Sequence, residues 1–238
     1  MHRPALRAST TPEIIGHRGT PREHPENSLP GFERALALGA DGIELDVHVT
    51  VDDVAVVHHD PELHAGPHAA RPISALTAAQ VGGTELAPGV TVPTLAAVLR
   101  LVAGRATVYV EVKAPNAEAA VARTLAGLGD LAPVHSFDHR VSRQVHALAP
   151  STPTGVLSTS YLIDNAAAVR AAGARDLWQH WSMIDAALVA EAHAAGARVL
   201  AWTVNDVDLA RALATLGVDG LCSDVPGVMR AAFPRATS

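Results

Sequence analysis

Short apolar runs alternate with longer runs rich in alanine and leucine along almost the whole chain. The short runs have the length of buried strands, and the longer runs place apolar residues at helical spacing. The predicted strands are Glu13–Gly16, Gly42–Val49, Thr107–Val112, Ala132–Phe137, Thr152–Leu157, Arg175–Gln179, Ala197–Val204 and Val218–Cys222. The predicted helices are Leu29–Leu38, Leu95–Val102, Ala117–Leu128, Arg140–Leu148, Leu162–Ala171, Ala186–Ala195, Leu209–Leu216 and Val225–Ala232.

Glycines mark the ends of several predicted helices. Gly39, Gly173, Gly196 and Gly217 each follow a helical run, where a C-cap glycine is favoured. Eight strands that alternate with helices, in a chain of about 250 residues, are typical of a closed parallel barrel. The pattern therefore predicts an α/β fold with a single (β/α)8 TIM barrel, and a doubly wound open sheet is the competing architecture.

The segment from Asp60 to Pro93 interrupts this rhythm, because it is rich in proline and glycine. Such a composition predicts a loop excursion after the second strand rather than another strand and helix. The excursion is short, and no interdomain linker is evident elsewhere in the chain. We therefore expect one TIM-barrel domain over residues 12–234.

Composition narrows the function classes. The chain has 238 residues, 48% of them hydrophobic and 18% charged, which suits a buried core and excludes a disordered chain. Cys222 is the only cysteine, so an intramolecular disulfide and a thiolate zinc cluster are excluded. A formal net charge of −6 lacks the basic field of a nucleic-acid-binding protein.

The sequence also lacks the signals of a membrane protein. No apolar run approaches the roughly 20 residues that span a bilayer. Residues 1–11 lack the apolar core of a signal peptide. We therefore expect no stable membrane insertion and a cytoplasmic location, and the sequence does not indicate an oligomeric state.

Three acidic side chains are expected to meet inside the predicted barrel. Residues two apart in a strand point to the same side, so Glu44 shares a face with Asp46, and Glu111 with Lys113. Buried carboxylates repel one another and lose their hydration, and a divalent cation relieves both costs. Oxygen ligands favour Ca²⁺ or Mg²⁺ over zinc or copper. The alternative is that these carboxylates pair with Lys113 and an arginine on a surface.

Two basic segments are expected beside these carboxylates. His17 and Arg18 follow the first strand, at the end of a barrel where active sites form. An arginine there can bind a phosphate through two hydrogen bonds. Two histidines and an oxygen-bound cation suit phosphoryl chemistry, with one histidine as base and the other as acid. Spacing alone does not choose between His58 and His59 for the second histidine.

Most of the 13 histidines are expected to be surface or structural residues. His48 alternates in phase with the two acidic residues of its strand and is a further candidate for the barrel interior. The histidines assigned to the surface or structural class are His2, His24, His64, His68, His139, His146 and His193.

A series of motifs follows one fixed order along the chain. The motifs are His17-Arg18-Gly19, Pro25-Glu26-Asn27-Ser28-Leu29, Phe32, Gly39 to Val47, Thr50, Asp52, Val56-Val57, His59-Asp60, Val92-Pro93-Thr94-Leu95, Glu111-Val112-Lys113, Ser136-Phe137, Trp202-Thr203-Val204-Asn205, Asp219-Gly220 and Ser223-Asp224. With these motifs the chain closely resembles the glycerophosphodiester phosphodiesterase family over nearly its whole length. The stretch from 17 to 60 is the most specific part of the resemblance.

The resemblance implies a barrel enzyme, a phosphoric diester hydrolase that cleaves small-molecule glycerophosphodiesters to sn-glycerol 3-phosphate and an alcohol. By position, it makes His17 and His59 the acid/base pair, which also resolves the choice of the second histidine. It makes Glu44, Asp46 and Glu111 the ligands of one divalent cation, Ca²⁺ or Mg²⁺. In this family a glycerol hydroxyl can attack phosphorus, and water then opens the cyclic phosphate.

The resemblance also implies residues that bind the substrate. Arg18 and Lys113 would contact the phosphate. Trp202 would line the substrate pocket, and a buried core position is the alternative for this side chain. Ser136 and His180 are further candidates for the rim of the site.

Other functions stay open at the level of sequence. A phospholipase D-like lyase would form a cyclic phosphate from lysophospholipids, but such enzymes are typically secreted with disulfides, which the lone Cys222 disfavours. A non-catalytic barrel that binds glycerophosphodiesters would have no physical need for three buried carboxylates. An aldolase or isomerase would need Lys113 as a neutral nucleophile, whereas the nearby Glu111 favours a charged lysine.

The chain departs from the usual pattern of the family at His58 and His64. The sequence does not indicate which head group of the substrate is preferred.

Overall fold

Nine strands form one sheet in the computed structural model, which describes residues 11–64 and 70–235. The sheet order is β1-β13-β12-β11-β10-β9-β8-β2-β3. Because β1 also pairs with β2, the parallel strands close into a ring of eight, and β3 lies outside it, antiparallel to β2. The ring consists of β1 (Glu13–Gly16), β2 (Gly42–Val49), β8 (Thr107–Val112), β9 (Val134–Ser136), β10 (Thr154–Ser158), β11 (Asp176–His180), β12 (Arg198–Trp202) and β13 (Gly220–Ser223). The predicted (β/α)8 barrel is confirmed.

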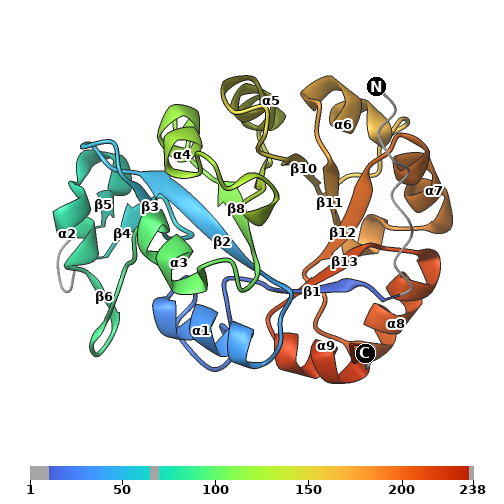
Figure 1. The fold of residues 1–238 in the computed structure, drawn as a ribbon, viewed down its shortest axis with the longest axis horizontal. Coiled ribbons are helices and arrows are strands. Elements are labelled where there is room, and N and C mark those ends of the chain that lie inside the picture. The colour runs from blue at the N-terminus through green and yellow to red at the C-terminus, as the bar shows by residue number, and fades with distance from the viewer. Residues whose placement is uncertain (1–10, 65–69, 236–238) are drawn as a thin grey trace.

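Helices follow the ring strands and lie around the outside of the sheet, as Figure 1 shows. They are α1 (Leu29–Ala37), α3 (Leu95–Val102), α4 (Glu118–Thr124), α5 (His139–Leu148), α6 (Ala166–Ala172), α7 (Ala186–Ala194), α8 (Val207–Leu216) and α9 (Pro226–Ala232). The predicted start of the helix Leu162–Ala171, which corresponds to α6, is wrong. The backbone N–H of Leu162 donates to the side chain of Asn165 at 2.8 Å, and this local turn delays the helix to Ala166.

The excursion after β2 is more ordered than the predicted loop, and its small elements project from one side of the barrel (Figure 1, cyan to teal). After β3 (Ala55–Val57), it contains β4 (Glu62–Leu63), β5 (Arg71–Pro72), α2 (Ala78–Gly82), β6 (Glu85–Ala87) and β7 (Val90–Thr91). These elements bury an apolar cluster of their own, formed by Val56, Leu63, Ile73, Leu76, Val81 and Val92. Apolar burial therefore stabilises this segment despite its proline and glycine.

Three layers of side chains fill the barrel along its axis. The middle layer is apolar and consists of Ile15, Tyr109, Leu157, Trp178, Leu200 and Cys222. The layer at the amino ends of the strands is charged, and so is the layer at their carboxyl ends. On the outer face of β2, Leu45 and Val47 belong to the same apolar cluster as residues of α3, so the acidic residues between them face inward, as predicted.

The charged side chains at the amino ends of the strands form ion pairs with one another. Arg198 contacts Asp176 at 2.8 Å and Glu13 at 3.2 Å, and it donates to the hydroxyl of Tyr109 at 3.0 Å. Arg175 forms a second pair with Asp176 at 2.8 Å. Burial alone would raise the pKa of Asp176, but the two arginines outweigh burial and lower it. Asp176 therefore holds two arginines at the closed end of the barrel.

We expect Asp176→Asn to lower the free energy of unfolding by about 3 kcal/mol, because it leaves two partly buried arginines without their shared carboxylate. Urea unfolding measures this loss. Asp130→Asn is the matched control, since the exposed Asp130 also contacts Arg175, and it should cost less than about 1 kcal/mol. Equal losses in the two variants would contradict this role of Asp176.

The same variant has an expected pH dependence. The folded chain lowers the pKa of Asp176, so its stabilising effect is present above about pH 4 and is lost as the pH falls further. The difference in stability between the unaltered chain and Asp176→Asn should therefore shrink in acid.

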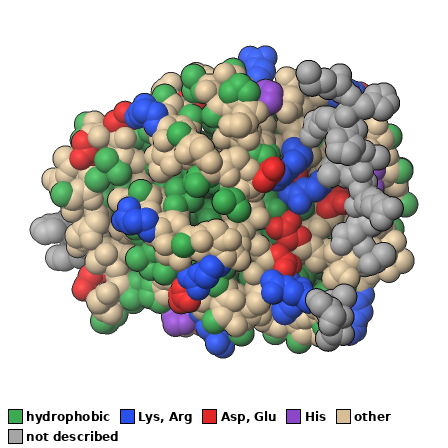
Figure 2. All heavy atoms as spheres, in the orientation of Figure 1, with side chains coloured by type: hydrophobic (Ala, Val, Ile, Leu, Met, Phe, Trp, Pro, Cys, Tyr) green, Lys and Arg blue, Asp and Glu red, His purple; other side chains and the backbone are tan. Residues whose placement is uncertain are grey.

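No helix within residues 11–64 and 70–235 is long and apolar enough to cross a bilayer. Figure 2 shows acidic and basic side chains mixed over the viewed face rather than gathered by sign. His2 and His68, which we assigned to the surface or structural class, lie outside the described residues.

Candidate active site

The carboxyl ends of β1, β2, β8 and β9 bring the predicted site residues to one mouth of the barrel. Asp46 of β2 lies in register with Glu111 of β8, and Glu44 lies one inward-facing position before it. His17 follows β1, and its Nε2 lies 4.0 Å from Glu44 Oε2. His59 follows β3, which the antiparallel pairing places beside the end of β2. Residues far apart in the sequence thus converge where barrel active sites form.

The carboxylates of this mouth are buried and share one electrostatic environment. Burial raises the pKa of Glu44 well above its usual value, and the nearby charges of Asp46 and Glu111 raise it further. Burial and the charge of Asp46 also raise the pKa of Glu111, although Lys113 opposes them. The folded environment therefore makes ionisation of these two glutamates unfavourable. A bound divalent cation would remove this repulsion, so the donor set fits the predicted cation.

Asp46 differs from the two glutamates because cations and an amide surround it. Its carboxylate lies 3.1 Å from Arg18 Nε and 3.5 Å from Lys113 Nζ, and it accepts a hydrogen bond of 2.8 Å from Asn27. Burial would raise the pKa of Asp46, but the charges of Arg18 and Lys113 outweigh it and lower the pKa. Lys113 also contacts Glu111 at 2.9 Å, so the predicted pair forms here inside the mouth.

Each candidate catalytic histidine has a carboxylate partner on Nδ1. His17 Nδ1 donates to Asp224 at 2.7 Å, and Asp224 accepts a further hydrogen bond of 2.7 Å from Asn205. His59 Nδ1 donates to Asp60 at 2.8 Å. A hydrogen bond on Nδ1 fixes the ring and leaves Nε2 as the atom that can exchange a proton. Both histidines thus have the arrangement that general acid/base catalysis needs.

The histidine on β2 that alternates with the acidic residues has a supporting contact. His48 is buried, and its Nε2 donates to the backbone carbonyl of His59 at 3.1 Å. Burial lowers the pKa of His48, so the ring is neutral at neutral pH. His48 therefore positions the loop that carries His59.

Trp202 lies at the mouth in a half-buried position. It lines a small cavity together with His17 and Glu44, and it packs edge-on against Phe137 at 5.4 Å and His180 at 5.3 Å between ring centroids. This placement agrees with the expected pocket position and makes His180 its neighbour. Ser136 is buried and donates to a backbone carbonyl of β8 at 2.8 Å.

Sequence reasoning missed several residues of this mouth. Asn27, Asn205 and Asp224 stood in the quoted motifs without a role, and the structure places them as partners of Asp46 and His17. His135 was not singled out at all, although it lies directly before Ser136, a candidate rim residue, in the same strand. It is buried, and burial lowers its pKa to about 3, so its ring is neutral at neutral pH.

Comparison with known proteins agrees with this geometry. The model of the glycerophosphoryl diester phosphodiesterase family matches residues 17–228. A glycerophosphodiester phosphodiesterase of Caldanaerobacter subterraneus is 28% identical over 229 residues, which cover 90% of this chain and 94% of that protein.

Solved structures share the fold over nearly the whole chain. A phosphodiesterase of Oleispira antarctica in complex with the product sn-glycerol-3-phosphate has a TM-score of 0.87 and 25% identity, covering 94% of this chain and 98% of that one. A glycerophosphodiester phosphodiesterase of Agrobacterium tumefaciens has a TM-score of 0.81 and 26% identity, covering 92% and 99%. The chain therefore belongs to the glycerophosphoryl diester phosphodiesterase family, which confirms both the family and the enzyme class that its motifs predicted.

Proposed function

We propose that the chain hydrolyses glycerophosphodiesters to sn-glycerol 3-phosphate and an alcohol, with one divalent cation and two catalytic histidines. The observation that carries this proposal is the pair of histidines, His17 and His59, each held by a carboxylate beside a buried cluster of acidic residues. The Oleispira antarctica relative in complex with sn-glycerol-3-phosphate supports the product. A non-catalytic binding barrel has no comparable support.

In this proposal Glu44, Asp46 and Glu111 hold the cation, which the sequence predicts to be Ca²⁺ or Mg²⁺. When bound, the cation neutralises charge on the phosphodiester and makes a hydroxyl group more acidic. Burial of the three carboxylates keeps competing water away from this charge.

Arg18 and Lys113 supply the remaining positive charge. Burial would lower the pKa of Arg18, but Asp46 and Glu26 outweigh burial and raise it, and the pKa of Lys113 is raised by Glu111 and Asp46 in the same way. Both side chains therefore stay charged and can neutralise the extra charge of a pentacoordinate phosphate.

The two histidines divide the proton transfers. One Nε2 takes a proton from the attacking hydroxyl or water, and the other gives a proton to the departing alcohol. Asp224 and Asp60 keep the rings of His17 and His59 oriented during these steps, since each accepts the Nδ1 hydrogen.

One surface feature favours the alternative substrate class, a lysophospholipid. Large apolar side chains are exposed in the loops after β10 and β11, on the same end of the barrel as the site. They are Tyr161, Leu162, Ile163, Trp181 and Met183. An exposed apolar rim can contact an acyl chain, so the lyase that forms a cyclic phosphate is the second candidate function.

We expect purified protein to release sn-glycerol 3-phosphate from glycerophosphocholine, to lose at least about 100-fold of its rate in EDTA, and to regain it with a divalent cation. Enzyme-coupled detection of glycerol 3-phosphate measures the rate. An unchanged rate in EDTA would contradict the role of the cation. Phosphorus NMR on lysophosphatidylcholine tests the second candidate, since a persistent cyclic phosphate there, without glycerol 3-phosphate, would favour the lyase.

The proposed catalytic domain is the predicted range 12–234. It includes every ring strand, from β1 at Glu13 to β13 at Ser223, and the last helix, which ends at Ala232. The cytoplasmic location stays a prediction of the sequence.

A further inference from the structure

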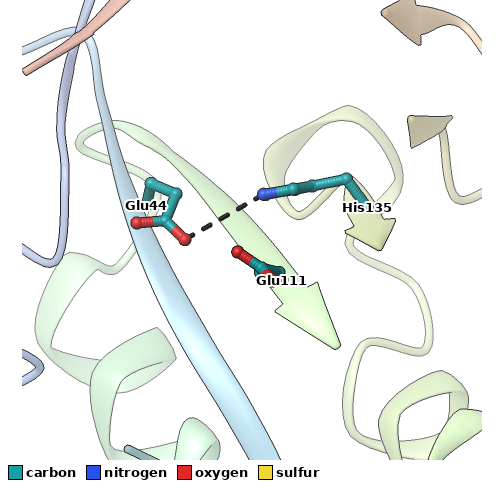
Figure 3. A group of neighbouring side chains, drawn as sticks. All are labelled: Glu44, Glu111 and His135. Carbon is teal, nitrogen blue, oxygen red and sulfur yellow. Dashed lines mark ion pairs between the residues drawn. The ribbon is translucent and has the colours of Figure 1, made fainter. Parts of the chain in front are cut away.

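A fourth side chain faces the carboxylates in the mouth. His135 is the middle residue of β9 and lies in register with Glu111, which lies in register with Asp46. Figure 3 shows a ring nitrogen of His135 pointing toward Glu44, with Glu111 beside this line. The distance from His135 Nε2 to Glu44 Oε1 is 4.0 Å. Three neighbouring strands thus present their polar side chains to one point.

The imidazole of His135 is buried without a hydrogen-bond partner. The side chain is 1% exposed, and neither ring nitrogen has a partner within the described part of the chain. A buried polar group left without a partner destabilises the folded chain. A catalytic role or a bound water or ion commonly explains such a group in a native protein.

The packing around His135 fixes the direction of its ring. The ring stacks on Trp178 with 4.2 Å between centroids and 10° between planes. Gly155 on the next strand leaves room for this stack, because a Cβ there would lie 2.9 Å from Trp178 Cδ1 and 3.2 Å from His135 Cβ. The ring is therefore held in place before any ligand binds.

The space between these side chains has the size of a single ion. A cavity of about 20 Å³ lies against His17, Glu44, Glu111 and His135, and it has room for one water-sized particle. Three possible ligand atoms lie within 4.8 Å of one another, one each from Glu44, Glu111 and His135. Metal–ligand bonds of about 2.0–2.6 Å allow ligand atoms of a shared ion to lie up to about 5 Å apart.

We propose that His135 Nε2 is an additional ligand of the cation, beside the three carboxylates, and that the site prefers a transition cation such as Mn²⁺ or Co²⁺ to Ca²⁺. Ca²⁺ takes oxygen ligands, whereas a neutral imidazole suits first-row transition cations. The inference rests on the cation site of the proposed function. It revises the choice of Ca²⁺ or Mg²⁺, which followed from the oxygen ligands alone.

Calorimetric titration with Co²⁺ and with Ca²⁺ tests this preference on tag-free protein stripped by a chelator. The unaltered chain should bind one Co²⁺ at least about tenfold more tightly than Ca²⁺. His135→Gln keeps a neutral polar side chain but removes the nitrogen ligand, so Co²⁺ affinity should fall roughly 10- to 100-fold. Ca²⁺ affinity should change by less than about threefold, because oxygen ligands dominate its binding. His64→Gln, at an exposed histidine, is the matched control and should leave both affinities unchanged.

Pulsed EPR of Mn²⁺ bound to the unaltered chain gives a second measurement that needs no variant to fold. It should show coupling between the ion and a directly bound nitrogen nucleus. Absence of this coupling, or an equal loss of Co²⁺ and Ca²⁺ affinity in His135→Gln, would overturn the role of His135 and leave the carboxylate site standing. If the unaltered chain binds no divalent cation, the inference falls together with the cation site of the proposed function.

Discussion

Replacing His17 or His59 with alanine should lower kcat for glycerophosphodiester cleavage by on the order of 10³, with a much smaller change in KM. In the proposed mechanism each histidine moves a proton only as the bond to phosphorus forms or breaks, so its loss should affect the transition state more than substrate binding. Both side chains are partly exposed and lie at the end of the barrel, so the variants should fold. Steady-state kinetics with a saturating cation separate kcat from KM.

A control variant and the double variant test this assignment further. His64→Ala removes an exposed histidine of the excursion and should leave kcat unchanged. If both histidines serve one concerted step, removing both should cost little more than removing one, because residues that act as a unit are not additive. Undiminished turnover in either single variant would refute the assigned acid/base pair.

The fold could be predicted because its signals are local. The boundaries of β1, β2 and β8 follow directly from apolar runs that end at turns or polar residues. The inward direction of Glu44 and Asp46 also follows from the sequence, since strand alternation requires only that β2 be regular. Gly173 and Gly217 end their helices with φ of 65° and 93°, a conformation that favours glycine.

The rest of the site depends on contacts between distant segments. His135 could be recognised only from the register of β9 against β8, which pairs it with Glu111. A three-residue strand does not reveal this register by its own pattern. The contact of His17 with Asp224 joins the first and last strands, and it exists because the barrel closes. Ring closure is a property of the whole chain, so local patterns cannot indicate such pairs.

The two charged ends of the barrel have opposite energetic roles. At the amino ends of the strands, Asp176 is balanced by Arg175 and Arg198, and the folded chain lowers its pKa. At the carboxyl ends, Glu44 and Glu111 have raised pKa values, because burial and neighbouring carboxylates oppose their charge. The first arrangement stabilises the barrel, and the second costs stability that a bound cation would restore.

Glu44→Gln should therefore change stability in opposite directions with and without a cation. In EDTA at neutral pH the variant should have a higher Tm than the unaltered chain, because it removes a carboxyl group whose ionisation the fold opposes. The amide oxygen can still accept the backbone N–H of Arg18, which now donates to Glu44 at 3.1 Å. With a cation at 100 times its Kd, the unaltered chain should gain about 2.7 kcal/mol, and the variant should gain much less. Thermal unfolding with and without cation measures both effects.

The pH dependence of this effect follows from the sign of the shift. The folded chain raises the pKa of Glu44, so its charge lowers stability only above about pH 4, where the unfolded chain ionises this group. The higher stability of the metal-free variant should thus vanish in acid and grow as the pH rises toward neutrality.

Glu33→Gln is the matched control, since Glu33 is exposed and pairs with Arg105 at the surface. It should alter neither the metal-free Tm nor the gain in stability with cation. If the cation stabilises Glu44→Gln as much as the unaltered chain, Glu44 is not a ligand. We also expect Glu44→Gln to lower kcat by on the order of 10², and in that case this loss would need another cause.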